Sequence, residues 1–538
     1  MTKIFAAALI GASALAISAG SAFAEYQLNI LHTNDLHSRI EPITKYDSTC
    51  APEDDAAGEC FGGVARLKTA IDQTRAGLSG QNVLLLDAGD QFQGSLFYTQ
   101  YKSGPVAEFM NAMGYDAMAI GNHEFDDGPE ELLKLIDAVD FPIISGNTVP
   151  TDDSILKDKY KGYVIKDIGG EKVAIVSVLA TDTGETSSPG PTITFEDDIA
   201  YLKKAVGEIE AEGVNKIILL SHVGYPRDQE IAAQVDGIDV IVGGHSHTLL
   251  SNTDDKAAGP YPTEVTNPAG VEVPIVTAYA YSKYLGDLNV TFDDNGVVTA
   301  ASGDPILLDA SFKPDEAIAA RVEELNGPLT EIKKKVVGEA TAEIVGDRTV
   351  CRAAECPMGD LVADAMLDRV ADQGITIAIQ NGGGVRASIG AGTVTMGDVL
   401  TVLPFQNTIA TFQLKGSDVV AALENGLSQI EDGAGRYPQV AGLNYTYDST
   451  KAPGSRIVSV EVDTDGDGDF SPIEPDTVYG VVSNNYMRAG GDGYSIFAEK
   501  GMNAYDFGPN LEDAVAAYIG ANSPYTPAID GRITDVAK

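Results

Sequence analysis

Short apolar runs alternate with amphipathic stretches from Tyr26 to about Leu308. The runs at 82–87 and 216–220 are rich in Val, Leu and Ile and predict buried strands. Between 130 and 139 the apolar positions recur every three to four residues, which predicts a helix. Strands that alternate with helices are typical of an α/β domain whose helices pack on a largely buried sheet. We therefore expect a layered α/β domain over residues 25–310.

A different pattern begins after a charged, helix-prone stretch. We interpret residues 311–335 as a linker helix and residues 336–538 as a second α/β domain. The second domain is predicted to contain helices near 360–370 and 417–428, with a strand at 376–380 between them. A chain of 538 residues is long enough for two domains that each bury a core.

The first 24 residues have the pattern of a secretory signal peptide. Lys3 precedes an apolar run from Ile4 to Ala19, and Ala22-Phe23-Ala24 forms a small-residue cleavage site. The alternative is a membrane anchor, but the run is shorter than the roughly 20 residues needed to span a bilayer. We therefore expect a periplasmic or secreted protein that is not attached to a membrane.

The chain carries 79 acidic and 36 basic side chains, for a formal net charge of −43. Such a charge disfavours binding to DNA, RNA or an anionic membrane through broad electrostatics. An anionic substrate must instead meet a local positive site. The composition leaves the oligomeric state open.

Four cysteines form two close pairs in the sequence, Cys50 with Cys60 and Cys351 with Cys356. In an oxidising compartment each pair is expected to close a local disulfide. A structural zinc site is the weaker alternative, because neither pair has CxxC spacing or a nearby histidine.

Polar side chains follow five of the predicted strands. The residues at these strand ends are Asp35, His37, Asp90, Asn122, His123, His222, His245 and His247. Open α/β sheets bind ligands outside the carboxyl ends of their strands, so we expect these side chains to meet in one crevice. Imidazole and carboxylate together suit zinc, manganese, iron or cobalt, whereas magnesium and calcium prefer oxygen ligands alone.

These segments resemble the motifs of calcineurin-type metallophosphoesterases, and they occur in the same order. The opening run from His32 to His37 further resembles the 5′-nucleotidase family. The resemblance implies a four-layer α/β sandwich and two metal ions. It assigns one metal to Asp35, His37 and His247, the other to Asn122, His222 and His245, and a bridging position to Asp90.

The same resemblance implies a catalytic pair, His123 and Asp126, and leaves His32 as a structural residue. Two divalent cations roughly 3.5–4 Å apart polarise a phosphoryl oxygen and lower the pKa of water, which favours in-line attack on a phosphate ester. Within the same resemblance, His123 stabilises the developing charge or protonates the leaving oxygen. For Asp126 the alternative is a helix N-cap, because Pro129 and Glu130 follow closely.

The second domain resembles the 5′-nucleotidase C-terminal domain. The resemblance covers the motif from Cys351 to Leu361, the Asn-Gly-Gly-Gly-x-Arg loop at 381–386, and two aromatic positions followed by an aspartate. It implies substrate contacts by Arg352, Asn381, Arg386, Phe405, Tyr486 and Asp492. Arginines bind phosphate oxygens through paired, charge-assisted hydrogen bonds, and two aromatic rings can stack on a flat base. Pro357 departs from the asparagine usual in the family.

One acidic loop fits the twelve-residue calcium template D-x-D-x-D-G-x5-E. Its acidic residues are Asp463, Asp465, Asp467, Asp469 and Glu474. The flanks at 456–462 and 477–483 are predicted strands, so the loop is not a helix-loop-helix sensor. The alternative is a solvated acidic turn.

Together these features predict an exported two-metal phosphohydrolase that acts on nucleoside 5′-phosphates. Rival hypotheses with the same chemistry are a nucleotide-sugar diphosphatase and a 2′,3′-cyclic-nucleotide phosphodiesterase. A hypothesis of another class is a non-catalytic, calcium-dependent binding module. Because the metal ligands and Arg386 belong to different domains, Arg386→Ala is expected to spare the hydrolysis of a small aryl phosphate.

Overall fold

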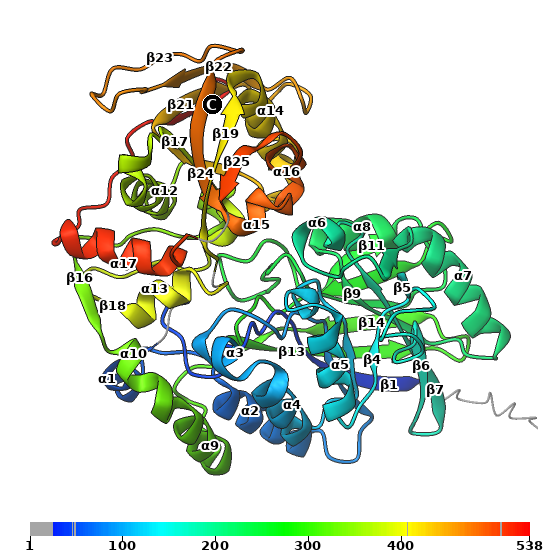
Figure 1. Cartoon of the computed structure of the whole chain (residues 1–538). Coiled ribbons are helices and arrows are strands. Elements are labelled where there is room, and N and C mark those ends of the chain that lie inside the picture. Colours follow the sequence, from blue (N-terminus) through cyan, green and yellow to red (C-terminus); the bar gives the residue numbers. More distant parts are fainter. Residues whose placement is uncertain (1–24, 46, 48–49, 406, 506–507) are drawn as a thin grey trace, which may run out of the picture.

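The N-terminal half is built on two β-sheets that lie face to face (Figure 1). The computed structural model describes residues 25–45, 47, 50–405, 407–505 and 508–538, so the predicted signal peptide at 1–24 lies outside the described residues. The first sheet has the order β14 (Val298–Gly303), β13 (Tyr284–Phe292), β1 (Tyr26–Thr33), β2 (Val83–Asp87), β3 (Ala117–Ala119) and β4 (Ile143–Ile144), with β15 (Ile306–Leu307) beside β13. The second has the order β11 (Thr263–Thr266), β12 (Glu272–Val276), β10 (Val240–Gly243), β9 (Ile217–His222), β7 (Glu171–Leu179) and β6 (Tyr163–Ile168). Strands β1 to β4 run parallel in the first sheet, as do β7, β9, β10 and β12 in the second.

Helices cover the outer face of each sheet. The helices of this half are α1 (Pro52–Ala57), α2 (Val64–Gly77), α3 (Leu96–Tyr101), α4 (Ser103–Met113), η1 (His123–Phe125), α5 (Pro129–Ala138), α6 (Thr183–Thr186), α7 (Asp198–Ala211) and α8 (Tyr225–Ala232). A small pair of strands, β5 (Thr148–Pro150) and β8 (Ile193–Phe195), lies apart from both sheets.

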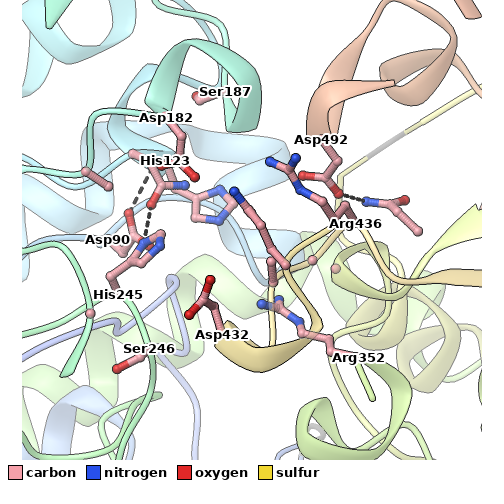
Figure 2. A pocket seen from close by; sticks show the side chains of 18 of the residues that line it. Asp90, His123, Asp182, Ser187, His245, Ser246, Arg352, Asp432, Arg436 and Asp492 are labelled. Carbon is pink, nitrogen blue, oxygen red and sulfur yellow. Dashed lines mark hydrogen bonds between the residues drawn. The ribbon is translucent and has the colours of Figure 1, made fainter. Parts of the chain in front are cut away.

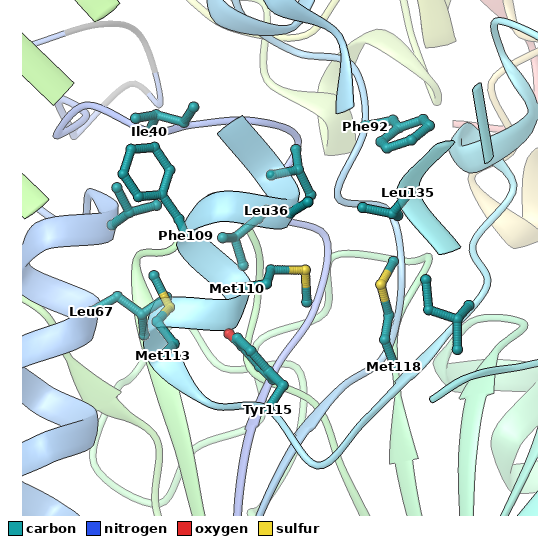
Figure 3. Close-up of a cluster of buried hydrophobic side chains, with 14 of the residues drawn as sticks. Leu36, Ile40, Leu67, Phe92, Phe109, Met110, Met113, Tyr115, Met118 and Leu135 are labelled. Carbon is teal, nitrogen blue, oxygen red and sulfur yellow. The ribbon is translucent and has the colours of Figure 1, made fainter. Parts of the chain in front are cut away.

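Successive side chains of a strand point to opposite faces of the sheet, which explains how each sheet packs against a second sheet on one face and helices on the other. Ile30 of β1 packs into the core between the two sheets, while the next residue, Leu31, packs against the helices on the outer face. Leu67, Phe109 and Met110 belong to that outer core, which Figure 3 shows. Because successive strand residues point to opposite faces, a strand covered on both faces is apolar throughout. The predicted four-layer α/β sandwich is confirmed.

Between the two halves the chain forms a broken helix. Its parts are α9 (Glu316–Asn326), η2 (Gly327–Leu329) and α10 (Thr330–Lys333). The sequence predicts one linker helix here, but Pro328 lacks a backbone N–H and interrupts it. Figure 1 shows these helices at the edge of the molecule, below the C-terminal half.

The C-terminal half is a mixed α/β domain around a five-stranded sheet. Its order is β20 (Pro438–Ala441), β17 (Ile377–Asn381), β24 (Val478–Asn484), β19 (Ile409–Lys415) and β25 (Met502–Tyr505). A four-stranded sheet contains β23 (Ser471–Pro472), β22 (Ile457–Val462), β21 (Leu443–Tyr447) and β26 (Ile533–Asp535), and β16 (Val336–Ala340) pairs with β18 (Gly392–Thr395). The helices are α11 (Arg348–Cys351), α12 (Pro357–Arg369), η3 (Ala371–Gln373), η4 (Gly382–Gly384), α13 (Met396–Val402), α14 (Gly416–Gly426), η5 (Ile430–Asp432), α15 (Asn485–Arg488), η6 (Gly491–Gly493), α16 (Ser495–Lys500) and α17 (Leu511–Ala521).

Both predicted disulfides are present. Cys50 is bonded to Cys60, and Cys351 is bonded to Cys356. The second bond closes a short turn that contains Arg352. Among the helices of the described residues, none has the length and apolar character needed to cross a bilayer.

Candidate active site

The segments after β1, β2, β3, β9 and β10 meet at the carboxyl edge of the two sheets. Of the seven predicted metal ligands, Asp35, His37, Asp90, His245 and His247 have φ between 50° and 75°. Non-glycine residues rarely adopt this left-handed conformation, and it persists only where the surrounding structure enforces it. The loops are therefore shaped to turn these side chains toward one another.

One group contains Asp35, His37 and His247. The Nε2 atoms of His37 and His247 lie 3.1 Å apart, and Nε2 of His247 is 3.3 Å from Oδ1 of Asp35. The ligand atoms of all three residues lie within 4.8 Å of one another. His247 is 210 residues from His37 in the chain, so the fold brings the group together.

A second group contains Asp90, His222 and His245. Oδ2 of Asp90 lies 3.1 Å from Nε2 of His222 and 3.8 Å from Nε2 of His37 in the first group. Asn122 joins this group, with its Oδ1 2.8 Å from Nδ1 of His245. Asp90 thus stands between the two groups, as the resemblance implies for a bridging ligand.

Two of the histidines, His37 and His222, have the backbone hydrogen bonds expected of metal ligands. Nδ1 of His37 donates to the carbonyl of Phe92 at 3.0 Å, and Nδ1 of His222 donates to the carbonyl of Ala88 at 2.6 Å. These bonds leave Nε2 of each ring facing the centre, where Nε2 of His222 lies 3.1 Å from Oδ2 of Asp90.

The pKa shifts of three of the four histidines in the two groups also fit a cation. Burial holds the pKa of His37 and His247 well below the usual value, and the nearby cations Arg386 and Arg348 act in the same direction. Burial also lowers the pKa of His245. A neutral imidazole is the form that binds a metal, so these three rings fit divalent cations, whereas at His222 the Asp90 and Asp35 carboxylates outweigh burial and raise the pKa to about 10.

His123 and Asp126 form a hydrogen-bonded pair beside this centre. Nδ1 of His123 lies 2.6 Å from Oδ2 of Asp126, and the backbone N–H of His123 donates to Asp90 at 2.9 Å. Burial lowers the pKa of His123, but the Asp126 and Asp90 carboxylates outweigh it and raise the pKa above its usual value. The alternative of a helix N-cap at Asp126 is wrong, because α5 begins at Pro129 with Gly128 as its N-cap.

Glu124 is a residue whose role the sequence did not reveal. Its buried carboxylate accepts backbone N–H groups from two loops: Oε2 from Asp90 at 2.9 Å and Gly121 at 2.6 Å, and Oε1 from Gln91 at 2.8 Å and Phe92 at 3.2 Å. It therefore holds the Asp90 loop against the His123 loop. An acidic residue directly after His123 was the only signal in the sequence.

Glu124→Gln is expected to lower the free energy of unfolding by about 2–6 kcal/mol. An amide nitrogen cannot accept hydrogen bonds, so two of the four N–H groups lose their acceptor, at about 1–3 kcal/mol each. Thermal unfolding followed by circular dichroism would measure the effect, with the exposed Glu130→Gln on α5 as the control. Equal melting temperatures for the two variants would contradict this role.

One cavity of about 770 Å³ joins the two halves of the molecule. Figure 2 shows Asp90, His123 and His245 on one side of it and Arg352, Arg436 and Asp492 on the other. All six predicted substrate residues line this cavity: Arg352, Asn381, Arg386, Phe405, Tyr486 and Asp492. The two sets of motifs found in the sequence therefore belong to a single site.

Asp492 lies at the centre of a polar network in the C-terminal half. Its Oδ2 accepts a hydrogen bond from Asn381 at 2.6 Å, and its Oδ1 accepts one from the Tyr486 hydroxyl at 3.2 Å. Asp492 itself has a φ of 54° within η6. The network fixes this carboxylate on the cavity wall, where it can accept hydrogen bonds from a ligand.

The two domains touch at the candidate metal centre, which the sequence did not predict. Nη2 of Arg386 lies 3.2 Å from Nε2 of His37, and the Phe405 ring lies over His123 with centroids 5.8 Å apart and an interplanar angle of 19°. Arg386 belongs to the other domain, as predicted, but its guanidinium contacts a candidate metal ligand, so we no longer expect its loss to spare the hydrolysis of a small aryl phosphate.

Three further arginines line the cavity: Arg227, Arg348 and Arg436. Arg348 donates to the carbonyl of His245 at 3.1 Å, and it precedes Arg352 by one helical turn. Burial lowers the pKa of Arg352, as do the neighbouring Arg348 and Arg386. The one-turn spacing could have identified Arg348, whereas Arg436 lies in an irregular segment without a motif.

His32 and the acidic loop lie outside this site. His32 is buried in β1 with Nε2 2.8 Å from the Tyr261 hydroxyl. In the loop, carboxylate oxygens of Asp463, Asp465 and Asp467 lie within 4.8 Å of one another. Among the described residues, neither Asp469 nor Glu474 joins that group.

Each half of the chain matches a known protein family. The calcineurin-like phosphoesterase model matches residues 28–249, and the model of the 5′-nucleotidase C-terminal domain matches residues 336–499. A 5′-nucleotidase of Bos taurus is 40% identical over 94% of this chain and 91% of its own, and a snake venom 5′-nucleotidase of Gloydius brevicauda is 37% identical over 98% and 91%. The crystal structure of a 5′-nucleotidase precursor from Thermus thermophilus has a TM-score of 0.90 at 40% identity, covering 95% of this chain and all of that one.

Proposed function

Because the chain belongs to the 5′-nucleotidase family of metal-dependent phosphoester hydrolases, we propose that it releases phosphate from nucleoside 5′-monophosphates. The observation that carries this proposal is the cavity of about 770 Å³, which joins two groups of metal-type ligands to the predicted nucleotide residues. No nucleic acid polymer is needed as a partner.

In this proposal Asp35, His37 and His247 hold one divalent cation, and Asn122, His222 and His245 hold the other, with Asp90 shared between them. Two such cations supply a polarised phosphoryl oxygen and a water of lowered pKa. The mixed imidazole and carboxylate donors favour zinc, manganese, cobalt or iron.

His123 is the proposed catalytic residue that the protein itself contributes. With Nδ1 bonded to Asp126, its Nε2 is the ring nitrogen left for the substrate. The raised pKa favours the protonated ring, which can stabilise negative charge on the phosphate or give a proton to the leaving oxygen. Asp126 orients the ring and is not required to change its own protonation.

The C-terminal half is proposed to position the nucleotide. Arg352 and Arg386 supply guanidinium donors for the phosphate oxygens. Phe405 and Tyr486 offer aromatic faces to the base, and stacking of this kind is worth about 1–3 kcal/mol per base. Asp492 accepts hydrogen bonds from the ribose hydroxyls, while Asn381 holds Asp492 in place.

We also propose that the protein is exported to the periplasm or the medium. The signal-type pattern at 1–24 and two disulfide bonds support an oxidising compartment. A relative named as a venom 5′-nucleotidase supports the same location.

A parallel assay of AMP, UDP-glucose and 2′,3′-cyclic AMP tests the proposed function. We expect the highest kcat/KM with AMP, loss of activity in EDTA, and recovery on adding manganese or zinc. A preference for UDP-glucose would favour a nucleotide-sugar diphosphatase, and a preference for the cyclic ester would favour a phosphodiesterase. EDTA-resistant hydrolysis, or none with any substrate, would reject the metal-dependent mechanism.

Arg386→Ala is expected to lower kcat/KM about 10- to 150-fold with both AMP and 4-nitrophenyl phosphate. Arg386 lies at the metal centre, and a charge-assisted hydrogen bond contributes about 1.5–3 kcal/mol. Steady-state kinetics on both substrates would measure this, with the exposed Arg369→Ala on α12 as the control. Full retention of the aryl phosphate activity would instead support a purely nucleotide-binding role.

Calcium binding by the acidic loop is a separate proposal. It depends on Asp463, Asp465 and Asp467, whose oxygens already lie close together. Isothermal titration with calcium is expected to give a binding heat that disappears in an Asp463→Ala, Asp467→Ala variant. The same heat from both proteins would show that this loop is a solvated turn.

A further inference from the structure

Ser187 extends the hydrogen-bonded pair of His123 and Asp126 by one residue. The Ser187 hydroxyl donates to Oδ1 of Asp126 at 2.7 Å, while Oδ2 of the same carboxylate lies 2.6 Å from Nδ1 of His123. The two oxygens of Asp126 are therefore occupied by different partners. Figure 2 shows Ser187 on the same side of the cavity as His123.

We propose that Ser187 is a positioning residue for catalysis, which acts on His123 through Asp126. This inference rests on the proposed function, because it requires His123 to act on the substrate. A carboxylate with only one partner can rotate about its terminal torsion, which is broad and has no strong preference. A second hydrogen bond from Ser187 restricts that rotation and so fixes the plane in which Asp126 meets the imidazole.

These hydrogen bonds orient the imidazole of His123 toward the candidate metal ligands. A ring nitrogen of His123 lies within 4.8 Å of the carboxylate of Asp90 and of a ring nitrogen of His37. The Phe405 ring covers one face of the imidazole. With Nδ1 held by Asp126 and one face covered, rotation of the Asp126 carboxylate is a remaining freedom, and Ser187 limits it.

The segment that carries Ser187 is itself tied to the metal centre. The backbone N–H of Ala180 donates to the carbonyl of His222 at 2.9 Å. Thr183 is fully buried, and its hydroxyl donates to the carbonyl of Ala180 at 2.7 Å. The backbone N–H of Ser187 then donates to the carbonyl of Thr183 at 3.0 Å, closing α6. Ser187 is thus placed by a continuous chain of hydrogen bonds that begins at a proposed ligand.

The same segment also contacts the nucleoside end of the cavity. Helix α6 lies against η6, the turn that carries Asp492. Contact between the two domains at this point brings the proposed ribose-binding carboxylate and Ser187 onto adjoining turns. Ser187 therefore lies beside the contact between the two domains.

A double-mutant cycle separates positioning from a general structural effect. It uses the wild type, Ser187→Ala, Asp126→Asn and the double variant, assayed with AMP. Ser187→Ala is expected to lower kcat about 3- to 10-fold with KM changed less than about twofold, as the loss of one hydrogen bond predicts. In the Asp126→Asn background the same substitution is expected to change kcat less than about twofold, because Ser187 acts only through Asp126.

Ser188→Ala is the matched control. Ser188 is exposed on the same segment and also borders the cavity, but it does not contact the Asp126 carboxylate, so this variant is expected to retain wild-type kcat. The inference is overturned if Ser187→Ala keeps full kcat, if Ser188→Ala loses as much, or if Ser187→Ala has the same effect in both backgrounds. If Asp126→Asn alone retains wild-type kcat, the proposed catalytic pair fails and the inference fails with it. If kcat falls in Asp126→Asn but not in Ser187→Ala, the role of Ser187 is rejected while the proposed pair of His123 and Asp126 stands.

Discussion

Asp90→Asn is expected to lower kcat/KM with AMP by at least about 10³-fold and to reduce the bound metal below two ions per chain. The cations supply several kcal/mol of charge stabilisation in the transition state, and each 1.36 kcal/mol corresponds to about a factor of ten in rate. The Asp90 carboxylate lies near both ligand groups, 3.1 Å from His222 and 3.8 Å from His37. Asparagine keeps the size of the side chain but removes its charge.

Metal analysis by mass spectrometry and steady-state kinetics would test this prediction together. The exposed Asp72→Asn on α2 serves as the control, because it removes one carboxylate of the same type far from the cavity. Wild-type metal content with wild-type activity in Asp90→Asn would contradict the shared position of this ligand. It would also remove the main support for a two-metal centre.

His123→Ala is expected to lower kcat with AMP by about 10²- to 10⁴-fold while KM changes less than about threefold. This is the usual contribution of a side chain that transfers a proton or stabilises charge in the transition state. Its ring is held by Asp126 and lies under Phe405 at the cavity wall, but it is not one of the proposed metal ligands. Metal content should therefore stay at the wild-type value.

Leaving-group dependence gives this prediction a sharper test. If His123 assists the leaving oxygen, the loss should be smaller with 4-nitrophenyl phosphate, whose leaving group is a weak base, than with AMP. Equal losses on both substrates would assign His123 to charge stabilisation on the phosphate. A fall in metal content that accounts for the lost activity would contradict a catalytic role.

The strand-end motifs explain why the sequence could predict the residues that gather in the candidate metal centre. Asp35, His222 and His245 each follow or end a strand, and parallel strands deliver their carboxyl ends to one edge. Strand geometry is local and periodic, so the sequence reveals it. The separation of two sheets and the four-layer arrangement came from the family resemblance.

Features that depend on contacts between distant segments could not be predicted. Glu124 holds two loops by accepting hydrogen bonds from backbone N–H groups. Nearly every residue type has such a group, so the sequence does not show which positions donate. The contact between Arg386 and His37 joins residues 349 positions apart in different domains. Arg436 has no spacing or motif around it. Such contacts are set by the packing of whole domains and not by local pattern.

In the acidic loop, the sequence template predicted more clustered acidic residues than the structure contains. Its sequence fits a calcium template, yet β23 begins at Ser471 and pairs with β22, so the chain after Asp469 continues along a strand. The calcium template describes only the spacing of acidic residues and does not take into account that the following residues pair with β22 as a strand. Three of the five predicted acidic residues gather as a result.

Because Arg352 lies between Cys351 and Cys356, the position of its side chain depends on whether the disulfide bond between these cysteines is oxidised or reduced. Arg352 projects from a short turn that is closed covalently, so the guanidinium is held at the cavity wall by a bond that thiols can break. Reduction in the cytosol of an expression host would release that turn without disturbing the histidine cluster in the other half. Recombinant protein made there would keep the candidate metal ligands in place but would lack the covalent constraint on Arg352, the residue proposed to bind phosphate, until oxidation forms the disulfide.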